Sequence, residues 1–422
     1  MQAILGLVKK ILPQSLRRRL LPPYHYLLAL FAALYYRFPS KHLVVIAITG
    51  TKGKTSTSEL INAIFEEAGY TTAVLNTVRF KIGSVSSQNL LKMTMPGRFF
   101  VQKFLREAVA SKCTHAIIEI TSEGARQFRH RFIELNALVF TNIAPEHIES
   151  HGSFENYLNA KLSIARALEN STKKDRVVVA NIDDPYGQKF LSINVPNKID
   201  FSISDAEHYT LGKSGTLLYF RDTEIKSGEP GIISVYNILA AATLATAFNI
   251  STDIIKRAVE KFKGTRGRLE KIDVGQKFSV IVDYAHTIES LRAVYEAFGG
   301  KKRICVFGST GGGRDTWKRP QMGTVADQYC DTIILTDEDP YDEDPQKIVR
   351  EISTGISKHR PIIEMDRREA IKFSLSRADE ESIVIITGKG TDPYIMGPHG
   401  TKQPWDDASV AREELIKLST PT

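Results

Sequence analysis

A length of 422 residues predicts two or three domains rather than one ordinary core. The composition, 42% hydrophobic and 25% charged, is that of a soluble globular protein, and the net charge of +8 suits anionic substrates, nucleic acid or a lipid surface without choosing among them. Cys113, Cys305 and Cys330 lie far apart without a C-x-x-C pair, which argues against a zinc ribbon and against a disulfide framework. We therefore expect a reducing, ATP-containing compartment, the cytoplasm.

The first forty residues form an apolar and basic arm. Apolar side chains from Ile4 to Leu12 fall on one helical face, Arg17 to Arg19 form a basic cluster, and Tyr24 to Tyr36 is almost wholly apolar or aromatic. These 13 residues are too few to cross a bilayer, for which about 20 are needed. Two interpretations stay open: a helical arm packed on the body or a partner, and an interfacial membrane helix.

A glycine-rich loop follows a buried strand. The apolar run 43–48 predicts the strand, and the apolar spacing from Ser56 onward predicts a helix. The loop between them can cradle a polyphosphate, with Lys54 reaching its outer oxygens and the Thr55 hydroxyl holding Mg²⁺. Ile48 stands where the general G-x-x-x-x-G-K-[ST] pattern has its first glycine. The predicted phosphate-binding residues are Gly50, Thr51, Lys52, Gly53, Lys54, Thr55 and Ser56.

Strands and helices alternate up to about residue 263, which predicts a mostly parallel sheet covered on both faces. Strands are expected at 73–75, 115–120, 137–140 and 177–180, helices at 99–110 and 154–168, small hairpins at 202–219, and an alanine-rich helix from Tyr236 with Asn237 in its first turn. Asn237 would contact a base or cap the helix. Glu119 ends a strand beside the loop. Its side chain would bind Mg²⁺ or orient a water molecule, or it would be a capping or salt-bridged residue. His147 and His151, near Glu146 and Glu149, would meet a metal or form an ordinary polar loop.

A basic turn at 265–270 precedes a second alternation. Strands are expected at 279–282, 303–307, 332–336 and 382–387, each followed by a polar or glycine-rich loop. Because such loops line one edge of an open parallel sheet, we expect a second ligand-binding domain with a Rossmann-like fold.

Eight ordered motifs carry a family resemblance. They are G-T-K-G-K-T at 50–55, E-I-T-S at 119–122, T-N-I-x-P-E-H-I-E-S-H-G at 141–152, Y-x-x-A-K at 157–161, N-I-D-D-P at 181–185, G-R-L-E at 267–270, V-D-Y-A-H-T at 282–287 and G-K-G-T-D at 388–392. Over about residues 43 to 420 the chain resembles the Mur ligase family, and most closely its branch of UDP-N-acetylmuramyl-tripeptide synthetases. In that family the loop takes the shorter G-T-x-G-K-T form, so Ile48 is no defect.

The resemblance implies an arm at 1–40, a central ATP-binding domain at 41–263 and a C-terminal ligase domain at 264–422. It implies an ATP-dependent acid–amino-acid ligase that adds an amino acid to a muramyl-peptide acceptor in peptidoglycan synthesis through an acyl phosphate. One alternative is a folylpolyglutamate or poly-γ-glutamate ligase. Another is a non-catalytic nucleotide-binding regulator. We would expect a regulator to have lost some of the residues implied in catalysis, but all of them are present.

The resemblance also implies roles for individual residues. Catalytic roles fall to Lys54, Glu119, His147 and Lys161; two Mg²⁺ ions would be held by Thr55, Glu119, His147 and Lys161, the last as a CO₂-derived carbamate. Further nucleotide contacts would be Asn237, Arg268 and Asp283. Substrate contacts would be Thr94, Pro96, Ser122, Arg314, Asp339, Tyr341, Gly388 and Asp392.

The chain departs from the branch in three places. The forty-residue arm stands where the branch has a UDP-binding domain, Met95 replaces a threonine, and Asp339 and Tyr341 replace the asparagine and arginine of a D-N-P-R loop. The added amino acid is therefore unassigned, and we expect an acceptor that is membrane-linked or whose nucleotide is not read. We expect a cytoplasmic monomer, peripheral to the inner face of the membrane through residues 1–40, and no nucleic-acid partner because the basic residues are dispersed.

Overall fold

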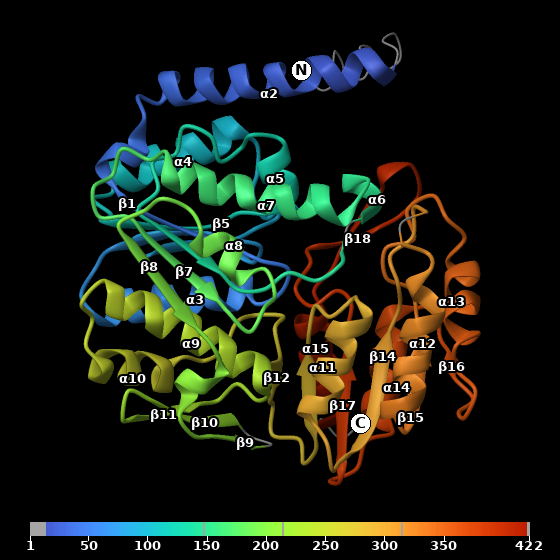
Figure 1. Ribbon diagram of the computed structural model, residues 1–422. Coiled ribbons are helices and arrows are strands. Elements are labelled where there is room, and N and C mark those ends of the chain that lie inside the picture. Colours follow the sequence, from blue (N-terminus) through green and yellow to red (C-terminus); the bar gives the residue numbers. More distant parts are fainter. Residues whose placement is uncertain (1–13, 147, 213–214, 314, 420–422) are drawn as a thin grey trace. The chain divides into compact units, whose positions relative to one another are not determined.

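The computed structural model describes residues 14–146, 148–212, 215–313 and 315–419. The chain forms two compact units, one containing the residues up to Ser202 with Thr243–Ile250, the other Ile203–Ala242 with Ser251 onward (Figure 1). The predicted apolar face from Ile4 to Leu12 lies outside the described residues. The domain boundaries predicted from the sequence remain predictions.

The first unit is built on an eight-stranded sheet in the order β4-β3-β2-β5-β1-β6-β7-β8. Its strands are β1 (Val44–Thr49), β2 (Thr72–Leu75), β3 (Arg79–Ile82), β4 (Val85–Gln88), β5 (His115–Glu119), β6 (Ala137–Phe140), β7 (Val177–Asn181) and β8 (Asn197–Phe201). In the order of the sheet, every neighbouring pair from β2 to β8 is parallel. At the other edge, β3 pairs antiparallel with both β2 and β4. The predicted mostly parallel sheet is confirmed.

Helices cover both faces of this sheet, because its central strands are apolar on both sides. They are α3 (Lys54–Glu67), α4 (Arg98–Ala110), α5 (Ser122–Arg126), α6 (Ile148–His151), α7 (Phe154–Glu169) and α8 (Gly187–Leu191). Figure 1 shows α3 on one face and α4, α5 and α7 on the other. Ile48 of β1 pairs with Glu119 of β5, so the end of β5 lies beside the end of β1.

An additional helix, α2 (Gln14–Tyr35), packs outside α4, and the 3-10 turn η1 (Pro39–His42) leads from it into β1 (Figure 1). The helix continues through Pro22 and Pro23. Among the described side chains of α2, the buried ones are small, namely Ala29, Ala32 and Ala33. Among the described residues, no helix has the length and apolar character needed to cross a bilayer.

The second unit begins with η2 (Ile203–Ala206) and a small antiparallel sheet. This sheet contains β9 (Tyr209–Gly212), β10 (Gly215–Phe220) and β11 (Thr223–Ser227), in the region where hairpins were predicted. The alanine-rich helix α9 spans Ile232–Ala247, of which the residues from Thr243 are counted with the first unit, and α10 spans Thr252–Lys261. Because α9 starts at Ile232, Asn237 is its sixth residue, and the prediction that Asn237 lies in the first turn was wrong.

A six-stranded sheet in the order β12-β13-β17-β14-β15-β16 forms the rest of the second unit. Its strands are β12 (Glu270–Ile272), β13 (Ser279–Val282), β14 (Lys302–Phe307), β15 (Thr332–Leu335), β16 (Ile362–Ile363) and β17 (Ser382–Ile386), all parallel from β13 to β16. One face carries α11 (Ile288–Ala297), α12 (Lys318–Tyr329) and α13 (Pro345–Ser353), the other α14 (Arg367–Ser376) and α15 (Asp407–Ser419). A short ribbon of β18 (Tyr394–Met396) and β19 (Lys402–Pro404) flanks η3 (Pro398–Gly400). The predicted second α/β domain is confirmed.

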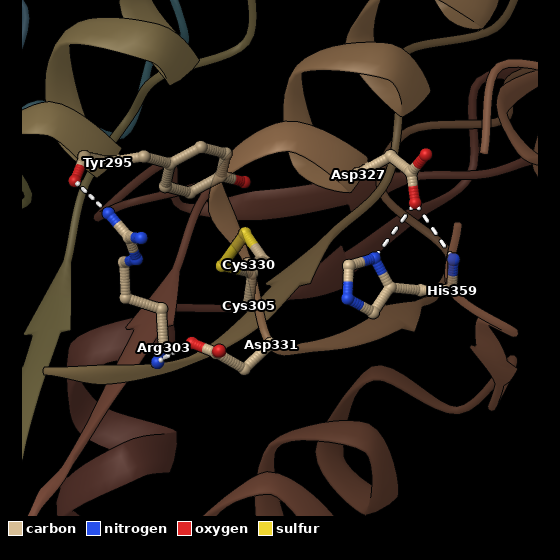
Figure 2. The surroundings of a disulfide bond; sticks show 7 residues. All are labelled: Tyr295, Arg303, Cys305, Asp327, Cys330, Asp331 and His359. Atoms are coloured by element: carbon tan, nitrogen blue, oxygen red, sulfur yellow. Dashed lines mark hydrogen bonds and ion pairs between the residues drawn. A yellow bond between two sulfur atoms is a disulfide. The ribbon is translucent and has the colours of Figure 1, made fainter. Parts of the chain in front are cut away.

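A disulfide joins Cys305 of β14 to Cys330, the residue after α12 (Figure 2). The sequence had argued against a disulfide framework because the three cysteines lie far apart without a C-x-x-C pair, and this bond contradicts that expectation. The helix α12 returns the chain to β15, which pairs with β14, so the two Cα atoms lie 6.1 Å apart. Both sulfurs belong to the core between the sheet and α11, α12 and α13. Cys113 is a free, buried cysteine.

Candidate active site

The loop between β1 and α3 is shaped by glycine. A Cβ atom on Gly50 would lie 2.0 Å from Thr141 Oγ1, so only glycine fits there. Gly53, the residue before α3, has a φ of 80°, a left-handed conformation that glycine adopts without strain. The first turn of α3 contains no acidic side chain, so its N-terminal N–H groups can face an anion.

The segment after β6 braces this loop. The Asn142 carbonyl accepts from Thr51 N at 2.8 Å, and its side-chain oxygen accepts from Lys52 N at 2.9 Å. Thr141 Oγ1 donates to the Lys52 carbonyl at 2.7 Å. These bonds fix the loop backbone before any ligand arrives, which lowers the cost of ordering it on binding.

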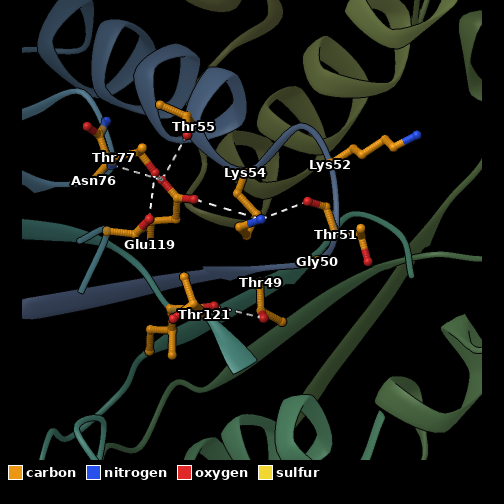
Figure 3. A network of polar contacts seen from close by, with 12 residues as sticks. Thr49, Gly50, Thr51, Lys52, Lys54, Thr55, Asn76, Thr77, Glu119 and Thr121 are labelled. Atoms are coloured by element: carbon orange, nitrogen blue, oxygen red, sulfur yellow. Dashed lines mark hydrogen bonds and ion pairs between the residues drawn. The ribbon is translucent and has the colours of Figure 1, made fainter. Parts of the chain in front are cut away.

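Lys54, Thr55 and Glu119 converge at the first turn of α3 (Figure 3). Thr55 Oγ1 donates to Glu119 Oε2 at 2.9 Å, and Lys54 Nζ lies 3.9 Å from Glu119 Oε1. Lys54 Nζ also donates to the Thr51 carbonyl at 2.8 Å. Thr77 adds its backbone N–H and its hydroxyl to Glu119 Oε2, at 3.2 and 3.0 Å. The sequence placed Glu119 beside the loop, and the structure brings these groups together.

Lys161 lies under the loop. Its amino group donates to the Gly50 carbonyl at 2.5 Å and sits 4.8 Å from the centre of the Tyr157 ring. The side chain is fully buried. Burial holds the pKa of Lys161 well below its usual value, and the nearby Lys54 ammonium lowers it further, against the opposing effect of Glu146 and Glu119. A lowered pKa makes the neutral, nucleophilic amine more accessible than it is for an exposed lysine.

The predicted histidine pair is only partly described. His147 lies outside the described residues, as does the side chain of Glu149. His151 Nε2 lies 3.1 Å from Ser122 Oγ, and its ring contacts that of Tyr157 edge to face. Within residues 14–146, 148–212, 215–313 and 315–419, no three His, Cys, Asp or Glu side chains converge as a metal cluster would require.

The segment 94–96 connects to the same centre. Thr94 Oγ1 lies 2.8 Å from Thr77 Oγ1, whose partner is Glu119. Met95 and Pro96 are buried just before α4. The predicted substrate segment is thus two hydrogen bonds from the carboxylate predicted to bind metal.

Two predicted nucleotide contacts lie together in the second unit. Asp283 is buried and accepts from Leu269 N and Ala285 N, each at 2.7 Å. Burial raises the pKa of Asp283, while Arg268 and these N–H groups oppose the shift. The Arg268 guanidinium lies 4.4 Å from the centre of the Tyr284 ring. Asn237, the third, is buried in α9.

The predicted amino-acid contacts form a buried charged cluster. Lys389 Nζ pairs with Asp339 Oδ1 at 2.9 Å and with Asp392 Oδ2 at 3.1 Å, and Asp339 Oδ1 also accepts from Met396 N. Tyr341 N donates to the Met396 carbonyl. A Cβ on Gly388 would lie 2.3 Å from Glu338 Oε2, so a glycine at this position leaves the space that the carboxylate occupies. Arg314 lies outside the described residues.

Sequence reasoning missed Glu338 and the supporting residues Thr77, Asn142 and Tyr157. Glu338 Oε1 accepts from Thr310 Oγ1 at 2.9 Å, whereas its buried Oε2 has no hydrogen-bond partner among the described residues. Tyr157 OH lies 2.9 Å from Thr51 Oγ1. The spacing of Tyr157 and Lys161, four residues apart on α7, was a signal that both face the loop.

Comparison with known proteins identifies the family. The family model for the Mur ligase middle domain matches residues 48–245, and that for the Mur ligase, glutamate ligase domain matches residues 267–390. The chain is 36% identical over 404 residues to the UDP-N-acetylmuramoyl-L-alanyl-D-glutamate--2,6-diaminopimelate ligase of Syntrophomonas wolfei, covering 92% of this chain and 81% of that one. It is 33% identical over 420 residues to the UDP-N-acetylmuramyl-tripeptide synthetase of a Roseiflexus species, covering 93% and 82%.

Solved structures give the same fold. A UDP-N-acetylmuramoyl-L-alanyl-D-glutamate--2, 6-diaminopimelate ligase matches with a TM-score of 0.62 and 28% identity, over 90% of this chain and 79% of that chain. The folylpolyglutamate synthase of Mycobacterium tuberculosis matches with a TM-score of 0.70 over 93% and 94%, at 14% identity, which is a likeness of fold alone.

The fold, the phosphate loop and the matched domains define an ATP-dependent carbon–nitrogen ligase. The chain belongs to the Mur ligase family. Membership implies ATP and Mg²⁺, and the residues present fit both. Gly53 has the left-handed conformation before α3, whose N-terminal N–H groups can face phosphate, while Glu119, Thr55 and Thr77 offer the carboxylate and hydroxyl oxygens that Mg²⁺ prefers.

Proposed function

We propose that this ligase adds an amino acid to a muramyl-peptide acceptor in peptidoglycan synthesis. The observation that carries the proposal is the convergence of Lys54, Thr55 and Glu119 on the phosphate loop, with Lys161 on the loop's first carbonyl. The two relatives named above are named for ligation or synthesis of muramyl peptides, which supports this acceptor class. We place the reaction in the cytoplasm, where ATP is supplied, and propose that a monomer carries it out.

The reaction proceeds in two steps. The γ-phosphoryl group of ATP passes to the acceptor carboxylate, which becomes an acyl phosphate, and ADP leaves. The amine of the incoming amino acid then attacks the acyl carbon, loses a proton and displaces inorganic phosphate to form the amide. Catalysis of this kind depends on positioning and charge neutralisation. The Lys54 ammonium neutralises charge on the transferred group, and the loop N–H groups and the α3 N-terminus hold the nucleotide phosphates.

Mg²⁺ supplies charge neutralisation when it is bound, and Thr55, Glu119, His147 and Lys161 are the residues proposed to hold two ions. For Lys161 the proposed species is a carbamate, because an ammonium would repel the metal. The neutral Lys161 amine adds to the carbon of CO₂ and releases a proton, which leaves an anionic oxygen ligand. The lowered pKa of Lys161 supports this step because the reaction needs the unprotonated amine.

A test of the carbamate uses ¹³C-labelled bicarbonate. We expect one carbamate resonance in the protein, absent from Lys161→Ala, and an ATP-dependent rate that falls when CO₂ is removed and returns when bicarbonate is added. Full activity in bicarbonate-free buffer would count against the carbamate while leaving the ligase reaction intact.

Substrate contacts are proposed on both units. Thr94, Pro96 and Ser122 contact the acceptor beside Glu119, and Asn237, Arg268 and Asp283 contact the nucleotide. The incoming amino acid is proposed to meet Arg314, Asp339, Tyr341, Gly388 and Asp392. We add Glu338 to this last set, because a buried carboxylate oxygen without a partner suits a donor such as an amino group.

The decisive experiment is an amino-acid screen that follows phosphate release with UDP-muramyl dipeptide, with Glu119→Gln as the inactive control. One or a few amino acids should give phosphate and an amide product of the expected mass. Turnover with folates or poly-γ-glutamate and none with muramyl peptides would indicate the other ligase branch. ATP binding without turnover across the full screen would indicate a regulator.

A further inference from the structure

We propose that α2 docks the enzyme on an anionic lipid bilayer by its exposed face. This inference goes beyond the ligase reaction, because it concerns a surface that shares no residue with the proposed catalytic cluster. It commits to one partner, the headgroup and acyl boundary of a negatively charged membrane.

Large apolar side chains line the outer face of α2. Leu20, Leu27, Phe31 and Leu34 follow one another at spacings of seven, four and three residues, so they lie on one side of the helix. Leu27, Phe31 and Leu34 are 50%, 58% and 51% exposed. Tyr35, at the C-terminal end of α2, is also exposed, and Phe99 of α4 lies beside it with ring centres 6.4 Å apart. We call Leu20, Leu27, Phe31 and Leu34 the apolar stripe.

The inner face of α2 has the opposite character. The buried residues Ala29, Ala32 and Ala33 are small, and Tyr26 packs edge to face on Phe132 with ring centres 5.1 Å apart. A soluble surface helix normally turns its large apolar residues inward and its polar residues outward. Here the four residues of the apolar stripe face outward, so docking of α2 on its own unit leaves the stripe uncovered, and Figure 1 shows α2 as an outer layer over α4.

The charge around the stripe selects the partner. Residues 1–42 contain seven Lys or Arg residues and no Asp or Glu, and the first acidic residue of the chain is Glu59. Arg37 and Lys41, just after α2, are exposed, and Arg17 to Arg19 precede the stripe in sequence. Basic residues on both sides of an apolar, tyrosine-containing helix match a membrane surface that carries negative lipids. A helix of this kind lies in the interface and does not span the bilayer.

Flotation of the full-length enzyme with vesicles tests the proposal. The probes are phosphatidylcholine vesicles with and without phosphatidylglycerol, and the variant is Leu27→Glu/Phe31→Glu/Leu34→Glu. The matched control, Val85→Glu/Ile363→Glu/Leu418→Glu, adds the same charge at three exposed apolar residues elsewhere. We expect the parent and the control to float with the anionic vesicles, and the stripe variant to partition about 100-fold less. ATP turnover in solution should be equal in all three, which shows that the stripe variant is folded.

Four results would overturn the proposal. One is a parent that does not float with anionic vesicles, and another is a stripe variant that floats as well as the parent. Equal flotation with neutral and anionic vesicles would remove the role of charge. The fourth is self-association, which light scattering measures. A dimer of the parent that the stripe variant converts to monomer would assign the apolar stripe to a second copy of the chain. Because turnover is measured separately, an inactive parent that floats would refute the ligase reaction and leave the docking surface standing.

Discussion

The amino group of Lys161 donates to the Gly50 carbonyl at 2.5 Å and thereby ties α7 to the first residue of the phosphate loop. A buried ammonium has a cost in folding free energy that a buried neutral amine does not have. The pKa of Lys161 is lowered in the folded state, so between that pKa and about 10.4, its unfolded value, the unfolded chain binds more protons. The free energy of unfolding should therefore rise with pH across this window.

The variant Lys161→Met should lose this rise and all ATP turnover together. Urea unfolding of protein freed of CO₂, in which Lys161 is an uncarbamylated amine, at a series of pH values from neutral to alkaline measures the slope. Lys103→Met, at an exposed lysine on α4, is the control and should keep the parent slope. A parent whose stability does not change over the window would show that Lys161 titrates normally.

We expect Tyr157→Phe to weaken ATP binding without abolishing chemistry. The Tyr157 hydroxyl lies 2.9 Å from Thr51 Oγ1 and so helps to position the loop. Losing one such hydrogen bond costs about 1 kcal/mol, or roughly five-fold in the KM for ATP, with kcat nearly unchanged. Steady-state kinetics measures both constants. Tyr219→Phe removes a hydroxyl bonded to Glu224 on the small sheet and should change neither.

The variant His115→Phe should stabilise the protein in acid. His115 is buried against Phe65 and Tyr70, and burial lowers its pKa to about 4. Because the unfolded imidazole titrates near 6.5, stability is lost as the pH falls from 6.5 to 4, and a ring that cannot be protonated avoids this loss. The free energy of unfolding of the variant minus that of the parent should be about 2 kcal/mol larger at pH 5 than at neutral pH.

Chemical unfolding at pH 5 and pH 7.5 measures the difference for His115→Phe. His208→Phe, at an exposed histidine, should show no such pH dependence. An equal effect of His115→Phe at both pH values would mean that packing, not protonation, explains it.

The buried pair of Arg367 and Asp407 should be sensitive to removal of either charge. Arg367 Nε and Nη2 donate to the two carboxylate oxygens at 2.8 and 2.7 Å, and both side chains are almost fully buried. Asp407→Asn leaves the guanidinium uncompensated and should lower the free energy of unfolding by about 3–5 kcal/mol. Glu380→Gln, which breaks an exposed pair with Lys277, should cost less than about 1 kcal/mol. Thermal and urea unfolding compare the two, and equal losses would show that burial does not set the cost.

Much of the fold could be predicted because its signals are local. The apolar run of β1, the glycines of the loop and the helical spacing of α3 lie within one continuous stretch. The position of Glu119 was also predictable, because parallel strands end at the same edge of a sheet, and the pairing of Ile48 with Glu119 confirms it. The start of α9 was misplaced because Ile232 and Ile233 follow Gly231 without any capping residue.

What the sequence did not reveal depends on contacts between distant residues. Asn142 braces a loop 90 residues earlier, and no spacing rule points to that pair. The Cys305–Cys330 bridge depends on the path of α12, and the inward turn of the alanines on α2 depends on what the helix packs against. Such details follow from packing rather than from periodicity.

The three cysteines have a practical consequence for measuring motion. Two sulfurs are joined in the core, and burial raises the pKa of the third, Cys113, which keeps its thiol protonated and out of reach of reagents. A cysteine introduced on the surface of each unit would thus react selectively with maleimide dyes in the otherwise unmodified chain. Fluorescence energy transfer between such a pair would then follow the distance between the two units as nucleotide, acceptor and amino acid are added in turn.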